Sequence, residues 1–328
     1  NGLKDGNQGF QDEGKYMAGP GKPAIEVGPN DADIIWVYDM REELGVFPHN
    51  VASSSVLVHG DKVFATTSNG QDWSHLNIPS PQSPSLVALH KETGEYAGEE
   101  MSGISERLMH CNWSSPSGAS VNGKDAVIFG AGDGWLYAYD PAPVALEDDP
   151  EIRKLPELWR YNAVPKRYTE YKYPDADGPS EIIATPVIHK GRAYVAIGQD
   201  PEHGEGVGNL VCVELDQEGE IAPDKALWTF EKLNRTISTV SIDPTTDLLF
   251  VADYSGYVYC IDANTGELYW KYDTKAHIWG YTLVADGKVY IGDEDGDLVI
   301  LPATKDFDPA KDEPLFETML PGPIYSTP

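Results

Sequence analysis

The sequence contains few cysteines and no long apolar segment, and both features exclude classes of protein. It has three cysteines in 328 residues, Cys111, Cys212 and Cys260, and no CxxC pair. A disulfide-built scaffold of this length would need many more. No run of about 18 apolar residues is present, so we expect no membrane span. The eight histidines form neither HxxxH nor HExxH, so we expect no metal ligands and no zinc enzyme.

Positive charge is also scarce. Lys and Arg total 24 against 53 for Asp and Glu, so the formal net charge is −29. Nucleic acids and anionic lipid surfaces would repel such a chain, and no basic stripe offsets this repulsion. We therefore expect no nucleic-acid partner. Hydrophobic residues make up 41% of the chain, which is enough to form a folded core.

Internal repeats carry most of the information about the fold. A Ser/Thr-rich start, an apolar run, a Gly turn and a second apolar run recur at 53–64, 184–194 and 281–290, with weaker copies from Ser114 and Ser238. Each start is followed by a turn, an alternating strand, another turn and, in most copies, a strand with tryptophan. Period-two alternation with Asp-Gly turns predicts antiparallel strands, and convincing amphipathic helices are absent.

Four strands in units of about 40–70 residues predict an all-β protein, a β-propeller of four-stranded antiparallel blades. Five complete blades are expected at approximately 51–101, 111–163, 181–233, 235–273 and 277–320. Residues 33–40 around Trp36 and residues 322–328 around Tyr325 would form a split or incomplete sixth blade. A parent with seven or eight blades is the alternative.

Residues 1–32 are interpreted as an N-terminal extension or an insertion between blades. The chain starts at Asn1 with neither a methionine nor a signal-like segment, so we expect it to be processed or truncated there. The split blade would need two further strands, which suggests native sequence beyond one of the two ends.

The segment from Cys260 to Trp270 resembles the tryptophan-docking motif AxDxxTGxxxW of the quinoprotein (PQQ-dependent dehydrogenase-like) propellers. Asp262, Thr265, Gly266 and Trp270 match it, and Cys260 replaces the alanine. The resemblance extends over most of the chain and implies a PQQ-like propeller in which the tryptophan of one blade packs against the next. That superfamily contains both dehydrogenases and non-catalytic scaffolds, including the propeller lipoprotein of the outer-membrane assembly machinery, so the fold does not decide the function.

Long insertions point to one end of the predicted propeller. They span about 69–84, 98–112, 162–180 and 198–209. They enter the innermost strand of a blade or join its second and third strands, and such connections share one face, the top face. Long loops on a rigid scaffold are where binding sites usually lie.

Aligning the repeat starts places one position of each blade in a polar ring around the propeller axis. The ring consists of Asn50, Cys111, Glu181, Arg235 and His277. Glu181 is the candidate base or metal ligand, Arg235 the candidate anion clamp and His277 the candidate proton shuttle. The alternative is that each blade fills a water-lined channel with any side chain that forms hydrogen bonds.

Three functions are compatible with this pattern. The first is a non-catalytic, secreted or periplasmic scaffold of bacterial type that binds a protein or a glycan through its top face. The second, a quinoprotein oxidoreductase of alcohols or sugars, would hold PQQ and calcium. Asn50 and Cys111 would then lie at the cofactor, Trp113 or Trp279 would stack on it, and Glu181 would bind the calcium. The third is a polysaccharide-active enzyme with paired carboxylates.

Two observations favour the non-catalytic function. The dehydrogenases often carry two adjacent cysteines beside the quinone, whereas Cys111 stands alone. Their spaced Glu, Asn and Asp set has no counterpart at matching positions. The acidic stretch from Asp293 to Asp297 resembles part of a calcium loop, but it occupies an ordinary hairpin position, so we expect a turn there.

Overall fold

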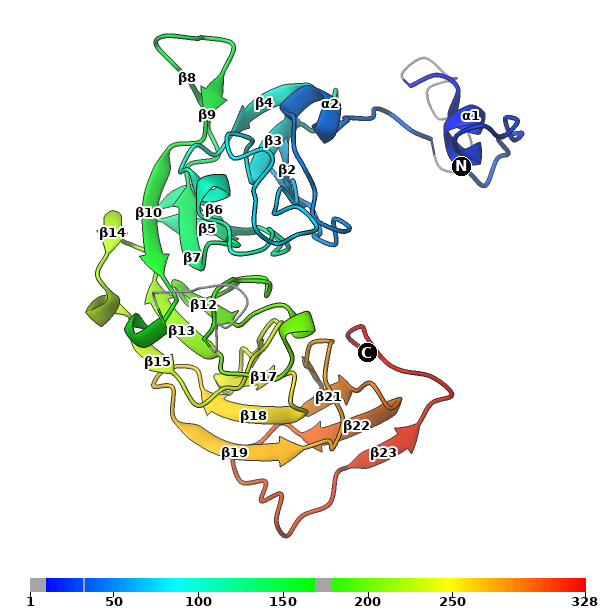
Figure 1. Cartoon of the computed structure of the whole chain (residues 1–328). Helices are drawn as coiled ribbons and strands as arrows, with labels where there is room; N and C mark the ends of the chain where they lie inside the picture. Colours follow the sequence, from blue (N-terminus) through cyan, green and yellow to red (C-terminus); the bar gives the residue numbers. More distant parts are fainter. Residues whose placement is uncertain (1–9, 32, 169–177) are drawn as a thin grey trace.

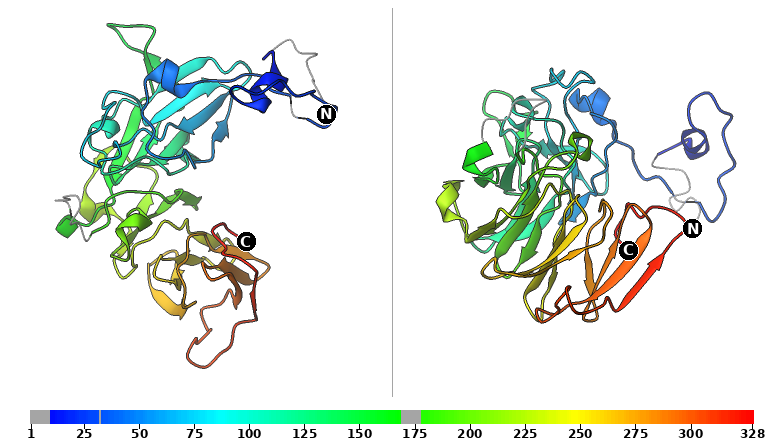
Figure 2. Two further views of the ribbon diagram at one scale, coloured as in Figure 1. Left: turned by 45° about the vertical axis from the view of Figure 1, so that its right-hand side comes forward. Right: turned by 60° about the horizontal axis from the view of Figure 1, so that its bottom comes forward.

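The computed structural model describes residues 10–31, 33–168 and 178–328, and strands dominate it (Figure 1). Five mainly antiparallel sheets follow one another along the chain and lie side by side around an open arc (Figures 1 and 2). The predicted all-β propeller architecture is confirmed, whereas the number of blades of the whole propeller stays a prediction.

Each sheet is built on four strands of the repeat. The first contains β1 (Leu57–His59), β2 (Lys62–Thr66), β3 (Leu86–His90) and β4 (Tyr96–Glu99). The second contains β5 (Ser117–Val121), β6 (Lys124–Gly130), β7 (Trp135–Tyr139) and β10 (Glu157–Asn162). The third contains β11 (Val187–His189), β12 (Arg192–Ile197), β13 (Asn209–Glu214) and β15 (Trp228–Phe230). The fourth contains β16 (Ser241–Asp243), β17 (Leu248–Ala252), β18 (Tyr257–Asp262) and β19 (Leu268–Asp273). The fifth contains β20 (Leu283–Ala285), β21 (Lys288–Gly292), β22 (Asp297–Pro302) and β23 (Phe316–Met319).

Three short strands extend the outer edges of the first two sheets. A hairpin of β8 (Val144–Ala145) and β9 (Arg153–Lys154) joins β4 by parallel pairing of β9, and β14 (Gly219–Ile221) pairs in parallel with β10. These additions protect two edges that would otherwise expose unpaired backbone groups.

Helices are short. They are α1 (Glu13–Ala18), α2 (Met40–Leu44) and the 3₁₀ turns η1 (Ile104–Glu106), η2 (Lys166–Tyr168), η3 (Pro201–His203) and η4 (Pro223–Lys225). In the part of the chain that the structure describes, no helix has the length and apolar character needed to cross a bilayer.

The hydrophobic core lies between the sheets. Four apolar clusters fill the four spaces between consecutive sheets, so the second, third and fourth sheets are covered on both faces. This explains the nearly fully buried β13 and the fully buried β17. The free cysteines are buried, and Cys212 and Cys260 belong to two of these clusters.

Tryptophans connect one sheet to the next. The indole Nε1 atoms of Trp159, Trp228 and Trp270, all on fourth strands, donate hydrogen bonds to backbone carbonyls of the following sheet at 2.8, 3.0 and 2.7 Å. Trp36 makes the same kind of bond, at 2.9 Å, to the carbonyl of Lys91 in the first sheet. The first three bonds tie the outer strand of one sheet to the turn that follows the third strand of the next, and Trp36 makes the same contact from a segment that is not a strand.

Residues 33–40 and 322–328, the two parts of the predicted split blade, contain no strand in the structure. Trp36 nevertheless occupies the position against the first sheet that a preceding blade would use. The split sixth blade and the interpretation of residues 1–32 stay predictions. Of that segment, the structure describes residues 10–31, which carry α1.

Candidate functional site

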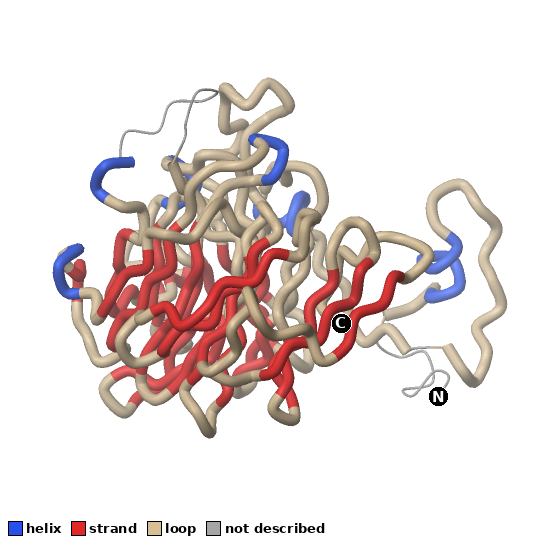
Figure 3. The backbone as a smooth tube through the Cα atoms, turned by 90° about the horizontal axis from the view of Figure 1, so that it is seen from below, coloured by secondary structure: helices blue, strands red, loops and turns tan. Residues whose placement is uncertain are grey.

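The long loops gather on one side of the strand layer, as the sequence pattern predicts (Figure 3). They comprise the connection between β2 and β3, the segment joining β4 to β5, and the connection between β12 and β13. The loop over 162–180 is only partly described, and Tyr171 and Tyr173, which it carries, lie outside the described residues.

Three histidines from separate loops meet on this side, at the first sheet. His49 precedes β1, His75 lies in the β2–β3 loop, and His110 lies just before β5. Nε2 of His49 lies 3.2 Å from Nε2 of His75 and 2.8 Å from Nε2 of His110. We call these three residues the histidine cluster.

Backbone pairing brings the three loops together. Isolated β-bridges join Pro48 to Asn69 and Gly70 to Cys111. The segment at Asn69 and Gly70 therefore pairs with the two segments that carry His49 and His110. A Cβ atom at Gly70 would lie 2.8 Å from Cβ of His49 and 2.8 Å from the carbonyl oxygen of His110. Only glycine fits between these two histidines without displacing them.

The loop that carries His75 is held by its own polar contacts. The Asp72 carboxylate accepts hydrogen bonds from the Ser74 hydroxyl, the Ser74 amide and the Asn77 side chain. These bonds lower the pKa of Asp72 to about 2. His75 itself adopts a left-handed backbone with φ of 56°. The conformation of the loop is therefore held by the hydrogen bonds of Asp72 and by the bridges at Asn69 and Gly70.

Burial and crowding keep His110 uncharged. The residue is 2% exposed, and desolvation together with the neighbouring His49, His75 and His203 lowers its pKa to about 3. Its Nδ1 atom has no hydrogen-bond partner among the described residues. His110 thus presents a neutral imidazole, which is the form that binds metal ions.

Aromatic residues flank the histidine cluster. The ring of Trp113 lies 4.9 Å from that of His110, and the ring of Trp73 lies 5.5 Å from that of His49. Trp73 is 76% exposed and Trp113 is half-buried. His203 on η3 stands next to the group, with its ring centre 6.0 Å from that of His110.

The predicted polar ring includes a buried group of three. The thiol of Cys111 donates to the carbonyl of Ser68 at 3.0 Å, and its pKa is raised, mainly by burial. Glu181 is fully buried, Oε1 accepts a hydrogen bond from the Asp200 amide at 2.9 Å, and burial raises its pKa to about 8. Arg235, also buried, donates from Nη1 to the carbonyl of Gly204 at 2.7 Å.

The remaining predicted site residues lie elsewhere. His277 stacks on Tyr254 with ring centres 4.2 Å apart, and one of its ring nitrogens pairs with the Tyr254 carbonyl at 2.7 Å. Trp279 donates to the Glu294 carboxylate at 3.2 Å. Asn50 is exposed in a left-handed turn with φ of 58°.

Tyr254 links the buried group of Cys111, Glu181 and Arg235 to His277. Its amide donates to the Arg235 carbonyl at 2.8 Å, while its ring stacks on His277. Glu181 lies close enough to Cys111 and to Arg235 to interact electrostatically with both, so these residues, Tyr254 and His277 form one continuous group. Contact between these residues does not test the catalytic and cofactor roles, which stay predictions.

The calcium and quinone roles stay predictions. Glu181, the expected calcium ligand, is fully buried, and burial raises the pKa of its carboxyl group to about 8. Its Oε1 atom accepts a hydrogen bond from the Asp200 amide, whereas Oε2 has no hydrogen-bond partner among the described residues. The thiol of Cys111 is buried and free, and the other two cysteines lie in the third and fourth sheets.

The acidic stretch after β21 is a hairpin turn. Asp293 accepts hydrogen bonds from the amides of Asp295 and Asp297 at 3.1 and 3.0 Å. The backbone of this turn recurs in three sheets, because the amides of Ala131, Asp253 and Asp293 each donate to the carbonyl four residues further on. The acidic stretch therefore occupies an ordinary hairpin position.

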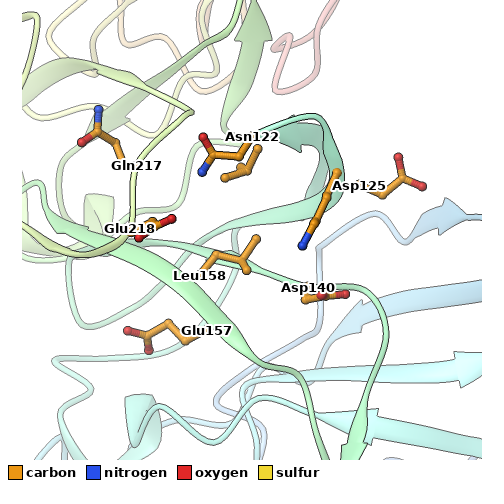
Figure 4. A pocket seen from close by; sticks show the side chains of 9 residues that line it. Asn122, Asp125, Asp140, Glu157, Leu158, Gln217 and Glu218 are labelled. Carbon is orange, nitrogen blue, oxygen red and sulfur yellow. The ribbon is translucent and has the colours of Figure 1, made fainter.

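A cavity of about 330 Å³ opens between the second and third sheets (Figure 4). Its lining contains Asn122, Asp125, Asp140, Glu157, Leu158, Gln217 and Glu218. The lining comes from the turn between β5 and β6, the loop after β7, the start of β10 and the loop after β13. Lys124 also lines it, beside the carboxylates. The histidine cluster is the stronger candidate, because three ligand atoms from separate loops meet there.

The histidine cluster was missed by sequence reasoning, which expected no metal ligands. That expectation rested on local spacing, and the paired residues are separated by 26 and 61 positions. The available signal was the location of His49, His75 and His110 in loops predicted for one face. The expectation of no metal ligands stays a prediction, and the spacing argument behind it does not cover tertiary contacts that bring the three rings together.

Comparisons with known proteins agree with this architecture. Residues 220–305 match the PQQ_2 family model, described as outer membrane protein assembly factor BamB. The fold is similar to that of BamB from Moraxella catarrhalis, with a TM-score of 0.57 and 15% identity over 84% of this chain and 66% of that one. The chain matches no curated protein sequence.

A second similar structure is an enzyme. Quinohemoprotein alcohol dehydrogenase ADHIIG from Pseudomonas putida HK5 gives a TM-score of 0.51 and 14% identity over 84% of this chain and 43% of that one. The chain thus spans just under two thirds of one relative and less than half of the other. At these identities the similarity concerns the fold.

Proposed function

We propose that this β-propeller, of which residues 220–305 match the PQQ_2 family model, is a non-catalytic scaffold that binds a protein partner through the loops of its top face. The observation that carries this proposal is the β2–β3 loop, where Trp73 is 76% and Leu76 is 73% exposed. Large apolar side chains in such positions are typical anchors of protein interfaces.

The loop is suited to recognition because it does not have to be ordered on binding. The hydrogen bonds of Asp72 and the bridge at Gly70 hold it against the first sheet. A preorganised loop avoids much of the entropy loss that binding otherwise requires. Two apolar side chains on such a support form a small, fixed binding surface.

We place the protein in the bacterial periplasm or outside the cell. The matched family model is described as an outer membrane assembly factor, which supports a position in the cell envelope. A net charge of −29 suits a protein that remains soluble and avoids anionic surfaces. Fractionation of the source cells tests this, and recovery in the cytoplasmic fraction would contradict it.

The binding function is tested with immobilised protein and an envelope extract. The double variant Trp73→Ala/Leu76→Ser is compared with Leu315→Ser/Phe316→Ser, which changes two exposed residues at the fifth sheet. We expect one protein to be retained by the wild type and by the control variant and lost from the loop variant. Equal retention by all three, or retention of polysaccharide alone, would refute the proposal.

A further inference from the structure

We propose that His49, His75 and His110 form a binding site for a divalent transition metal of the type that prefers imidazole, with Zn²⁺ as the reference ion. The site lies at the first sheet, on the loop side of the propeller. It uses residues from three separate segments and does not depend on the scaffold function proposed above.

The spacing of the nitrogen atoms fits such an ion. Zinc–nitrogen bonds of about 2.0–2.1 Å in a tetrahedral site place two ligand nitrogens about 3.3 Å apart. The Nε2 atoms of His75 and His110 lie 3.2 and 2.8 Å from Nε2 of His49, and one ligand atom from each ring falls within 4.8 Å of the others. Shifts of a few tenths of an ångström would open the site to the size of the ion.

Hydrogen bonding gives a second argument. One ring nitrogen of His49, Nδ1, lies 2.7 Å from the carbonyl oxygen of Gln71, which can only accept, so Nδ1 must carry the proton. In the neutral ring of His49, Nε2 is then unprotonated and has a free lone pair, and the Nε2 atoms of His75 and His110 both lie next to it. A single lone pair accepts one good hydrogen bond, whereas a metal ion between the rings can bind all three nitrogens.

The surroundings are those of a metal site. The carbonyl of Gln71 orients the first ligand in the way that outer-shell acceptors orient metal-bound histidines. Trp113 packs against His110 and restricts access from one side. His75 is half-buried, so the cluster reaches the protein surface through this residue.

Three protein ligands leave one tetrahedral position open. This is the ligand number of zinc sites that keep a position for water or a small anion, whereas structural zinc sites are filled by four side chains. His203 is the obvious fourth candidate, but its ring centre is 6.0 Å from that of His110, compared with 4.4–4.8 Å among the cluster rings. We therefore assign three ligands and an open position.

The test is metal titration of the full chain after removal of metal with a chelator. Zn²⁺ is added in competition with a chromophoric chelator, and Co²⁺ is used as the spectroscopic probe for low-coordinate geometry. We expect one equivalent of Zn²⁺ to bind and the unfolding midpoint to rise with Zn²⁺ concentration. Cu²⁺ should bind more tightly than Zn²⁺, and Ca²⁺ should not compete.

Variants assign the ligands. His75→Ala, on a surface loop, and His110→Ala should each weaken Zn²⁺ binding by roughly 100-fold or more. His277→Ala, outside the cluster, should leave it unchanged. His203→Ala should retain binding within about threefold, and a loss as large as that of His110→Ala would overturn the three-ligand assignment.

Folding of each variant is checked in chelator by circular dichroism and thermal unfolding. If His110→Ala does not fold, His75→Ala decides the matter, because its side chain is only half-buried. Absence of stoichiometric binding by the wild type, or equal binding by the wild type and a folded His75→Ala variant, would refute the proposed site.

Discussion

The contact between Trp228 and Gly266 allows a sharp test of how neighbouring sheets are joined. Gly266 has φ of +74°, and a Cβ atom built on it would lie 2.8 Å from two ring carbons of Trp228 in the third sheet. Gly191 has nearly the same backbone, with φ of +75°, and its Cβ would meet nothing within 4 Å. The pair therefore separates backbone strain from the contact between sheets.

The expected magnitudes follow from these two environments. Alanine in a left-handed backbone costs about 1–2 kcal/mol, and this should be the whole effect of Gly191→Ala. Gly266→Ala should add about 1–3 kcal/mol, because the methyl group must displace an indole that is 8% exposed and bonded to Ala263. Its total loss of unfolding free energy should be about 2–5 kcal/mol.

Urea unfolding followed by circular dichroism measures both variants. Trp228→Leu, alone and combined with Gly266→Ala, completes a double-mutant cycle, since a smaller side chain relieves the collision. The two substitutions should then be non-additive by at least about 1 kcal/mol. Equal destabilisation by Gly191→Ala and Gly266→Ala would refute the reasoning, because it would mean that the indole does not restrict this position.

Three further predictions concern buried groups. Burial raises the pKa of Glu100 to about 7 from 4.5, so the folded state keeps a proton that the unfolded state releases between these values. As pH rises from 4.5 to 7, the unfolding free energy should fall by about 3 kcal/mol because of this carboxyl group. The unfolding free energy of Glu100→Gln, measured by denaturation over the same pH range, should fall by that much less. Trp159→Phe should cost about 1–3 kcal/mol, since it removes the buried indole hydrogen bond to the Leu215 carbonyl, which keeps only its bond from the Gln217 amide, and leaves part of a fully buried ring site empty. Trp36→Phe, at a more exposed bond, should cost less than about 1 kcal/mol; similar urea midpoints for the two would contradict this. Burial raises the pKa of Cys111, so a thiol reagent should modify it only after denaturation, and rapid labelling of the native protein would contradict the observed burial.

Much of the fold was predictable because its signals are local. Alternation along 257–262 and the turn at Asn264 to Gly266 specify a strand and a hairpin wherever they occur. Repetition of this pattern then predicts sheets that cover one another's faces, and the apolar clusters between sheets are its consequence. Strand length and exact pairing of the outer edges were not predictable, because β9 and β14 pair with strands of the preceding sheet.

The candidate sites show the limit of this reasoning. Alignment of the repeats placed Glu181 in the ring but could not show that it is enclosed and that burial raises its pKa to about 8. Protonation depends on the atoms that surround a group in space, and these come from Asp200 and Cys111 of other segments.

The sequence by itself determined the repeated strand pattern, the turns and the position of the long loops, because each depends on neighbouring residues and on the burial of alternate side chains. Only the tertiary structure decided that His49, His75 and His110 meet, since their separations of 26 and 61 positions follow no local period. The bridges at Asn69 and Gly70 close these loops and create the cluster, and no side chain larger than hydrogen fits at Gly70 beside His49.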